Sequence, residues 1–205
     1  MIQHLTQAVD TVLRTALQGP DNRPLIALSG GSTPRGYMPA IAALPLDWGR
    51  VDWMLADERL VPRDHADSNE ALNRDLMAGT AMETCGFVDL RQLAGQQTPP
   101  PRWPIDLVLL GMGDDGHIAS LFPQSPALTD PAPIALEAEA PPAPHPPHRR
   151  ATLSVPALTA ARHVFLVISG DNKVQIWEQA RSGASPTTLP AALLADHPGL
   201  QVFHV

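Results

Sequence analysis

The sequence predicts an α/β fold, a Rossmann-like parallel sheet flanked by helices on both faces, in a single domain over residues 1–205. Three observations predict it. Short apolar runs rich in branched residues, such as Ile105 to Leu110, alternate with segments of helical periodicity. Several apolar runs end in glycines and polar side chains, as strands do where open α/β sheets bind ligands. The length of 205 residues suits one domain with a substantial core.

The first half of the chain is expected to alternate helices and strands. Apolar residues recur at three- and four-residue spacings over residues 4–18, which predicts an amphipathic helix. Thr33 and Pro34 suit the N-cap and the first position of a second helix. The expected elements are a helix over 4–18, a strand over 25–28, a helix from Pro34 to about Leu44, a strand over 51–56 ending in the charged turn Asp57-Glu58-Arg59, and a helix capped by Asp67-Ser68-Asn69 that reaches about Met77.

The second half is expected to continue this alternation around one long loop. Residues 124–148 are dense in Pro and Ala without periodicity, which predicts a surface loop in extended or polyproline conformation. Its histidines, His145 and His148, show no spacing that indicates a metal site. The expected elements are a weaker strand over 87–93, the central strand over 105–110, strands over 149–155 and 163–169, a helix that opens at Gly170-Asp171-Asn172-Lys173, a short helix over 189–194 and a closing strand over 200–205.

Composition and charge exclude several classes of protein. A net charge of −7 argues against nucleic acid or an anionic membrane as partner, although a few local cations suffice for a small anion. The single cysteine, Cys85, excludes an internal disulfide and a cysteine-cluster metal site. No segment approaches the length of a membrane span, and the N-terminal residues lack the pattern of a secretion signal. A cytoplasmic protein is therefore expected.

The block from Gly111 to Pro123 is the strongest indication of a functional site. It places three glycines, two aspartates and a histidine just beyond the expected central strand. Glycines let a ligand approach the backbone closely. A histidine side chain such as that of His117 can take up or release a proton in catalysis, and a nearby carboxylate such as Asp115 can fix its tautomer. The alternative is an ordinary loop with a helix cap. The letters also match G-x-G-x-x-G, but two acidic residues inside the loop disfavour a bound dinucleotide.

Three further positions point to an anionic ligand. Ser29-Gly30-Gly31-Ser32-Thr33-Pro34 places glycines and hydroxyls between a strand and a helix N-terminus, which is a ready anion site. An ordinary capped loop would need neither Gly30 nor Gly31. Arg59, at the end of the next strand, is a candidate oxyanion or phosphate ligand, with a solvated turn as the alternative. Lys173 in the first turn of a helix opposes the helix dipole, so we expect it to face an anion.

Four pieces together resemble the 6-phosphogluconolactonase family, within the larger group that includes glucosamine-6-phosphate deaminases. The resemblance covers nearly the whole chain. Its most specific part is the block of glycines, Asp and His followed by Ala-Ser-Leu-Phe-Pro. The pieces are Gly30-Gly31-Ser32-Thr33-Pro34, Asp57-Glu58-Arg59-Leu60-Val61-Pro62 with Asp67-Ser68-Asn69, Gly111 to Pro123, and Arg150-Ala151-Thr152-Leu153-Ser154.

The resemblance implies hydrolysis of 6-phosphoglucono-1,5-lactone to 6-phosphogluconate in the oxidative pentose phosphate pathway, without metal or cofactor. Such hydrolysis needs a base, a positioned water and stabilisation of an oxyanion. The expected catalytic residues are His117 as base, Asp115 as its orienting group and Arg59 as a ligand of substrate or of transition-state charge. The expected substrate- and phosphate-binding residues are Gly30, Gly31, Ser32, Thr33, Asp57, Gly113, Arg150 and Lys173, with Arg149 as an alternative phosphate contact.

Two other functions remain open at this point. Deaminases of the same fold carry a Glu five places after the motif histidine, where this chain has Phe122, which cannot transfer a proton. A non-catalytic sugar-phosphate sensor would keep the phosphate loop but would not need His117. The expected partner is a small sugar-phosphate lactone, with no nucleic acid and no membrane, and the chain is expected to be a monomer or a weak homo-oligomer.

Overall fold

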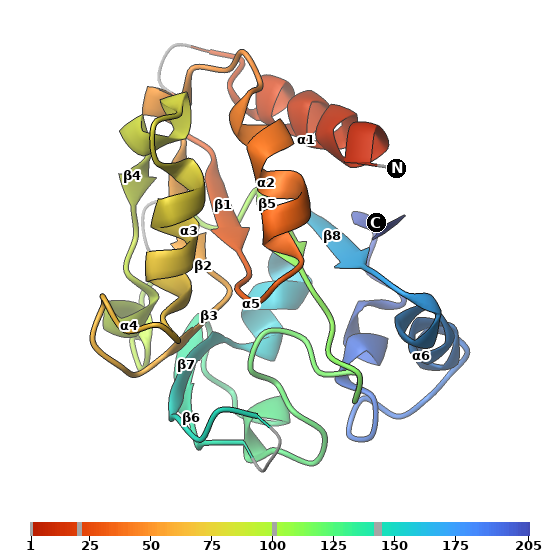
Figure 1. The fold of residues 1–205 in the computed structure, drawn as a ribbon. Helices are drawn as coiled ribbons and strands as arrows, with labels where there is room; N and C mark the ends of the chain where they lie inside the picture. The colour runs from red at the N-terminus through yellow and green to blue at the C-terminus, as the bar shows by residue number, and fades with distance from the viewer. Residues whose placement is uncertain (1, 20–21, 100–101, 142–144) are drawn as a thin grey trace.

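The computed structural model describes residues 2–19, 22–99, 102–141 and 145–205. It contains a six-stranded sheet in the order β4-β2-β1-β5-β8-β9, in which every neighbouring pair of strands is parallel (Figure 1). A second, antiparallel sheet has the order β3-β7-β6 and lies beyond the carboxyl ends of the central strands. The parallel α/β sheet predicted from the sequence is therefore confirmed, and the small second sheet is an addition to it.

The elements follow one another in this order: α1 (Ile2–Ala16), β1 (Leu25–Leu28), α2 (Pro34–Ala42), η1 (Trp48–Arg50), β2 (Asp52–Leu55), β3 (Asp57–Arg59), α3 (Asn69–Met77), η2 (Ala81–Thr84), β4 (Gly86–Phe87), α4 (Leu90–Leu93), β5 (Leu107–Leu110), η3 (Pro126–Leu128), β6 (Ala135–Ala138), β7 (Arg150–Leu153), α5 (Val155–Ala160), β8 (His163–Ile168), α6 (Asp171–Arg181), η4 (Pro190–Leu194) and β9 (Leu200–His204). Those labelled η are short 3-10 helices.

The core lies between this sheet and two layers of helices. Every residue of β1, β2 and β5 is buried, as expected for parallel strands that are covered on both faces. Helices α1, α2 and α3 pack side by side over the face nearer the viewer in Figure 1, and α5 lies behind the sheet. Helix α1 turns Leu5, Val9, Val12 and Leu13 inward, which confirms its predicted amphipathic pattern.

The order of the strands creates a crevice between β1 and β5. From β1 the chain moves to β2 and β4 on one side, then returns to β5 on the other side of β1. The connections that leave β1 and β5 therefore diverge, and open α/β sheets bind ligands at such a point, beyond the carboxyl ends of the strands. The two glycine-rich loops follow these two strands, so the topology brings them together.

Two predicted segments take a different structure. The weaker strand expected over 87–93 is only the two-residue β4, because Asp89 accepts a hydrogen bond from the backbone N–H of Arg91 and caps the short helix α4. The strand expected over 149–155 ends at Leu153, because Ser154 caps α5 by accepting from the backbone N–H of Ala157 at 3.1 Å. Both errors arise from polar residues that start a helix directly after an apolar run.

The second sheet accounts for two other corrections. Asp57-Glu58-Arg59, expected as a turn, is strand β3 and pairs with β7. The expected surface loop over 124–148 holds η3 and strand β6, which pairs with the other edge of β7 and buries Ala135, Leu136 and Ala138. Strands this short depend on pairing partners far away in the sequence, so local patterns do not predict them. Within the described residues, no helix combines the length and the apolar character needed to cross a membrane.

Candidate active site

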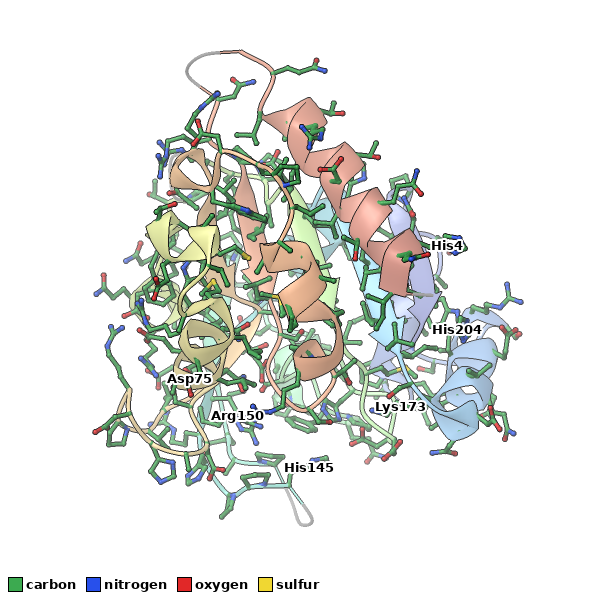
Figure 2. All side chains as sticks on the ribbon, turned by 45° about the horizontal axis from the view of Figure 1, so that its top comes forward. His4, Asp75, His145, Arg150, Lys173 and His204 are labelled. Carbon is green, nitrogen blue, oxygen red and sulfur yellow. The ribbon has the colours of Figure 1, made fainter. Side chains whose placement is uncertain are left out.

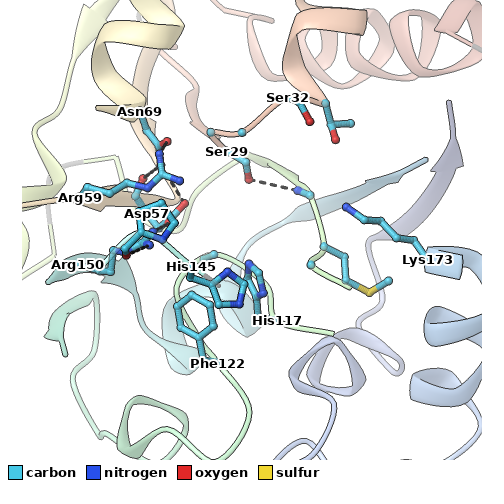
Figure 3. Close-up of a pocket in the computed structure, with 18 residues that line it drawn as sticks. Ser29, Ser32, Asp57, Arg59, Asn69, His117, Phe122, His145, Arg150 and Lys173 are labelled. Atoms are coloured by element: carbon cyan, nitrogen blue, oxygen red, sulfur yellow. Dashed lines mark hydrogen bonds and ion pairs between the residues drawn. The ribbon is translucent and has the colours of Figure 1, made fainter. Parts of the chain in front are cut away.

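A cavity of about 210 Å³ lies at the carboxyl ends of β1 and β5 (Figure 3). It contains every site residue predicted from the sequence except Asp115, which contacts His117, and Arg149, which pairs with Glu137. Its lining comprises Ser29, Gly30, Gly31, Ser32, Thr33, Asp57, Arg59, Asn69, Gly111, Met112, Gly113, His117, Ala119, Phe122, His145, Pro146, Arg150 and Lys173.

The loop after β5 holds a histidine–carboxylate pair. Nδ1 of His117 lies 2.5 Å from Oδ1 of Asp115, and the backbone N–H of His117 donates to the same oxygen at 3.1 Å. A carboxylate only accepts hydrogen bonds, so the proton of the neutral ring lies on Nδ1 and Nε2 is left as the basic nitrogen. A Cβ at position 113 would overlap both side chains, so the pair requires Gly113. The contact expected between Asp115 and His117 is thus present.

The pair keeps Asp115 ionised. Burial is the largest influence and acts to raise the pKa of the Asp115 carboxyl, but the hydrogen bonds and positive charge supplied by His117 outweigh it. The pKa of Asp115 therefore lies well below its usual range. An ionised Asp115 can stabilise His117 whenever the imidazole gains a proton, which is what a general base requires.

The loop after β1 forms another side of the cavity. The Ser29 hydroxyl donates to the carbonyl of Leu109 at 2.9 Å and accepts from the backbone N–H of Gly111 at 3.3 Å, which ties the two glycine-rich loops together. Gly31 has a φ of +84°, a conformation that glycine favours. Thr33 makes no side-chain capping hydrogen bond to α2, contrary to the prediction. The Ser32 and Thr33 residues instead border the cavity at the helix N-terminus.

Strand β3 supplies the polar wall beside these loops. Arg59 donates through Nη1 to the backbone carbonyl of Asp67 and to Oδ1 of Asn69, each at 2.8 Å. Asn69 in turn donates to the carbonyl of Asp57 at 2.8 Å, while Oδ2 of Asp57 accepts from the Ser120 hydroxyl at 2.7 Å. A Cβ on Gly30 would overlap the Asn69 amide, so this glycine allows the close approach of α3.

Glu58 points to the opposite face of β3 and supports the wall from behind. Its carboxylate is 1% exposed and accepts the backbone N–H groups of Asn69 and Glu70, each at 2.8 Å. It also accepts from Arg91 at 3.0 Å. Glu58 therefore binds the N-terminus of α3, which fixes Asn69 and through it Arg59. Successive side chains of a strand point to opposite faces, so Glu58 faces away from the cavity while its neighbours in β3, Asp57 and Arg59, face it.

Two cations approach the cavity from separate elements. Arg150 on β7 is 3% exposed and donates to the carbonyls of His148 and Pro146, each at 3.1 Å. Burial lowers the pKa of the Arg150 guanidinium, and Asp57, 3.8 Å away, acts in the opposite direction. Lys173 comes from the first turn of α6, across the cavity from Arg150 (Figure 3). Figure 2 shows both cations and His145 at one end of the molecule.

His145 also lines the cavity, although the sequence does not predict this. Its ring lies 5.1 Å from that of His117 and 5.0 Å from that of Phe122, while Phe122 lies 4.5 Å from His117. Phe122 is 7% exposed and packs against the ring of His117. The position of His145 depends on the fold of the proline-rich segment, so the sequence carried no indication of it.

In the part of the chain that the structure describes, two groups of side chains are close enough to hold a metal ion. One comprises Asp115, His117 and His145, and the other comprises His65, Asp67 and His148. In the first group Asp115 and His117 are already joined by a short hydrogen bond. In the second, Nε2 of His148 lies 2.9 Å from Oδ2 of Asp67, and Nδ1 of His65 accepts from the backbone N–H of Asp67 at 3.0 Å. Hydrogen bonding therefore accounts for most of the contacts in both groups.

A histidine–carboxylate pair beside a glycine-rich loop and a helix N-terminus, at the switch point of a parallel sheet, is an arrangement typical of an α/β enzyme. The comparisons with known proteins agree. The family model of glucosamine-6-phosphate isomerases/6-phosphogluconolactonase matches residues 1–203, and the chain belongs to this family.

Individual relatives point to one branch of the family. The 6-phosphogluconolactonase of Pseudomonas aeruginosa is 40% identical over 179 residues, which cover 79% of this chain and 73% of that protein. The 6-phosphogluconolactonase of Neisseria meningitidis is 32% identical over 97% of this chain and 90% of that protein. The crystal structure of a 6-phosphogluconolactonase from Shewanella baltica has a TM-score of 0.85 and 29% identity, over 99% of this chain and 92% of that one.

Proposed function

We propose that this chain hydrolyses 6-phosphoglucono-1,5-lactone to 6-phosphogluconate in the oxidative pentose phosphate pathway, by direct attack of water. The relatives named above support the lactone as substrate. The observation that carries the mechanism is the His117–Asp115 pair, with 2.5 Å between Nδ1 and Oδ1, inside a cavity that also holds a helix N-terminus and three cationic side chains.

The proposed reaction uses His117 twice. Nε2 of His117 takes a proton from a water molecule as the water oxygen attacks the lactone carbonyl carbon. The carbonyl oxygen becomes an oxyanion, which Arg59 stabilises from β3. When the carbonyl re-forms, the bond from C1 to the ring oxygen breaks, and the ring oxygen takes the proton from His117. Asp115 stabilises the imidazolium between the two transfers.

The phosphate group is assigned to the other part of the cavity. The backbone N–H groups and hydroxyls of Gly31, Ser32 and Thr33 lie at the N-terminus of α2, which favours an anion. Lys173 and Arg150 add charge-assisted hydrogen bonds to phosphate oxygens. The two ends of the substrate thus meet different elements of the fold, the loop after β5 at the lactone and the loop after β1 at the phosphate.

The direct test is lactone hydrolysis by the purified protein, measured above the spontaneous rate, beside the variant His117→Ala. We expect the variant to fold and to lose about 10²–10⁴-fold in kcat, the usual contribution of general acid–base catalysis. Circular dichroism and thermal unfolding serve as the control for the fold. A variant with nearly wild-type kcat would remove His117 from the mechanism.

Deamination of an amino sugar phosphate is disfavoured by the ring of Phe122. That ring lies 4.5 Å from the His117 ring at an interplanar angle of 35°, so an apolar side chain stands where ring opening needs a proton-transferring carboxylate. We expect no release of ammonia from glucosamine-6-phosphate in parallel assays. Release at a rate comparable with lactone hydrolysis would favour the deaminase.

A further inference from the structure

We propose that His145 is a further substrate-contacting residue, which hydrogen-bonds the oxygen atoms at the lactone end of the sugar phosphate. This inference rests on the function proposed above, and it adds a contact made by the proline-rich segment. The observations that carry it are the position of the ring in the cavity, its contact with Asp115 and the fixed conformation of the segment that holds it.

The ring of His145 stands beside the catalytic pair. Its centroid lies 5.1 Å from that of His117, and the two ring planes are nearly perpendicular, at 89°. Its Nε2 lies 3.4 Å from Oδ2 of Asp115, whose other oxygen, Oδ1, contacts His117. One carboxylate is thus shared by two imidazoles. The two rings lie side by side in Figure 3, so a sugar whose carbonyl carbon is placed at His117 would have its nearest oxygens beside His145.

The chemistry of imidazole suits this role. With Nε2 directed at Asp115, the second nitrogen of His145 remains able to bond a ligand, as a donor or an acceptor according to protonation. Its side chain is 27% exposed, and the ring borders the cavity between Phe122 and Pro146. A sugar hydroxyl can satisfy either state of that nitrogen, and a protonated His145 would also attract the carboxylate of the product.

Hydrogen bonds hold the segment that follows His145 in place. Arg150 donates to the carbonyls of Pro146 and His148, and Nε2 of His148 lies 2.9 Å from Oδ2 of Asp67. These contacts connect the segment to β7 and to the residues that precede α3. The imidazole is therefore positioned before the substrate arrives, which reduces the entropy lost when its hydrogen bond forms.

The test measures binding of 6-phosphogluconate and of inorganic phosphate by calorimetry, so it does not depend on turnover. His145→Phe keeps a ring against Phe122 but removes both nitrogens, and we expect it to raise the Kd for 6-phosphogluconate about 5- to 20-fold. His145→Gln restores a hydrogen-bonding group, so its Kd for 6-phosphogluconate should stay within about 3-fold of the wild-type value. Both variants should bind inorganic phosphate with the affinity of the wild type, whereas Lys173→Ala should bind it more weakly. His4→Gln, on α1 away from His145 in Figure 2, is the surface control.

Any other result would contradict either this inference or the proposed function. Unchanged affinity of His145→Phe for 6-phosphogluconate would overturn the inference. An equal loss of affinity of His145→Phe for inorganic phosphate would also overturn it, because that result would indicate a distorted cavity. A His145→Gln variant that binds 6-phosphogluconate as weakly as His145→Phe does would overturn it as well. A wild-type protein that binds 6-phosphogluconate but leaves the lactone intact would overturn the proposed function alone. Lactone hydrolysis with unchanged product affinity in His145→Phe would overturn this inference alone.

Discussion

At the scale of single residues, the site depends on how closely two side chains can pack against a glycine. The His117 ring and the Asp115 carboxylate occupy the space that a side chain at position 113 would fill. Their hydrogen bond fixes the tautomer, and the depressed pKa of Asp115 shows that the bond favours the ionised carboxylate. The catalysis that we propose for His117 is therefore expected to be sensitive to small changes in the backbone and charge around it.

Gly113→Ala is expected to lower kcat at least about tenfold while leaving the protein folded, because misplacing a catalytic group by about 1 Å costs that much or more. The added methyl group would push the His117 ring and the Asp115 carboxylate away from their present positions. Gly36→Ala is the matched control, since a Cβ at position 36 meets nothing within 4 Å. Steady-state kinetics check the prediction, and equal kcat in both variants would contradict it.

The Asp115 carboxylate should also affect stability in a defined range of pH. Its pKa is lower in the folded protein than the ordinary value of 3.8, so the folded state binds fewer protons than the unfolded state as the pH falls. The stabilisation is complete above about pH 4 and is lost progressively below it. The Tm of wild type should exceed that of Asp115→Asn near pH 7, and the difference should shrink below about pH 4. A difference that does not change with pH would refute this explanation.

At the scale of elements, β3 uses its alternation to serve two purposes. Asp57 and Arg59 face the cavity, whereas Glu58 faces α3 and accepts the first N–H groups of that helix together with Arg91. A carboxylate at a helix N-terminus is stabilised by the helix dipole as well as by these bonds. The element that carries Arg59 is thus fixed to the helix that carries Asn69.

Glu58→Gln should lower the free energy of unfolding by about 2 kcal/mol, because it removes one of the two buried carboxylates that Arg91 contacts, leaving only Glu70, and turns an amide toward backbone N–H donors. Urea denaturation measures the change. Glu137→Gln breaks an ion pair with Arg149 that is about half exposed, so it should cost less than about 0.5 kcal/mol. A similar loss in both variants would show that the contacts of Glu58 contribute no more than a surface pair.

The parallel sheet was predictable because its strands are buried on both faces and therefore form continuous apolar runs, as β1 and β5 do. The residues of the glycine loops were predictable for a related reason, since they follow those runs directly. Strands β3 and β6 are short and gain their stability from pairing with the distant β7, so their local sequence predicts a turn and a loop. The approach of His145 to the cavity depends on that same pairing, which explains why the sequence did not reveal it.

At the scale of the whole molecule, the cavity is built where the parallel sheet meets the antiparallel one. The loops after β1 and β5 come from the first sheet, Arg59 and Arg150 come from the second, and Lys173 arrives on α6. The Asn172 amide donates to Asp114 at 3.3 Å, which links α6 to the loop after β5. A substrate with two different ends can therefore be held at each end by a different element of the fold.

Lys173→Ala should distinguish binding of the phosphate end of the substrate from binding of its lactone end. We expect it to raise KM for the phosphorylated lactone at least about tenfold, because a charge-assisted hydrogen bond contributes about 1.5–3 kcal/mol. The KM for unphosphorylated gluconolactone should change little, since that substrate has no phosphate for Lys173 to bind. Initial rates with both lactones check this. An equal rise in KM for the two would assign Lys173 to a role other than phosphate binding.

The placement of β1 beside β5 also affects how the chain acquires its fold. Residue Ile26 pairs with Leu107, so the central pair of strands joins residues about eighty positions apart. Closing so long a loop slows folding, because its entropy is lost before the contacts form. During synthesis, β1 can pair with β2 early, but its other edge stays open until β5 has left the ribosome. The two glycine-rich loops meet only at that stage, so the catalytic cavity is a late product of folding, and the open edge of β1 is the place where a nascent chain is most exposed to mispairing.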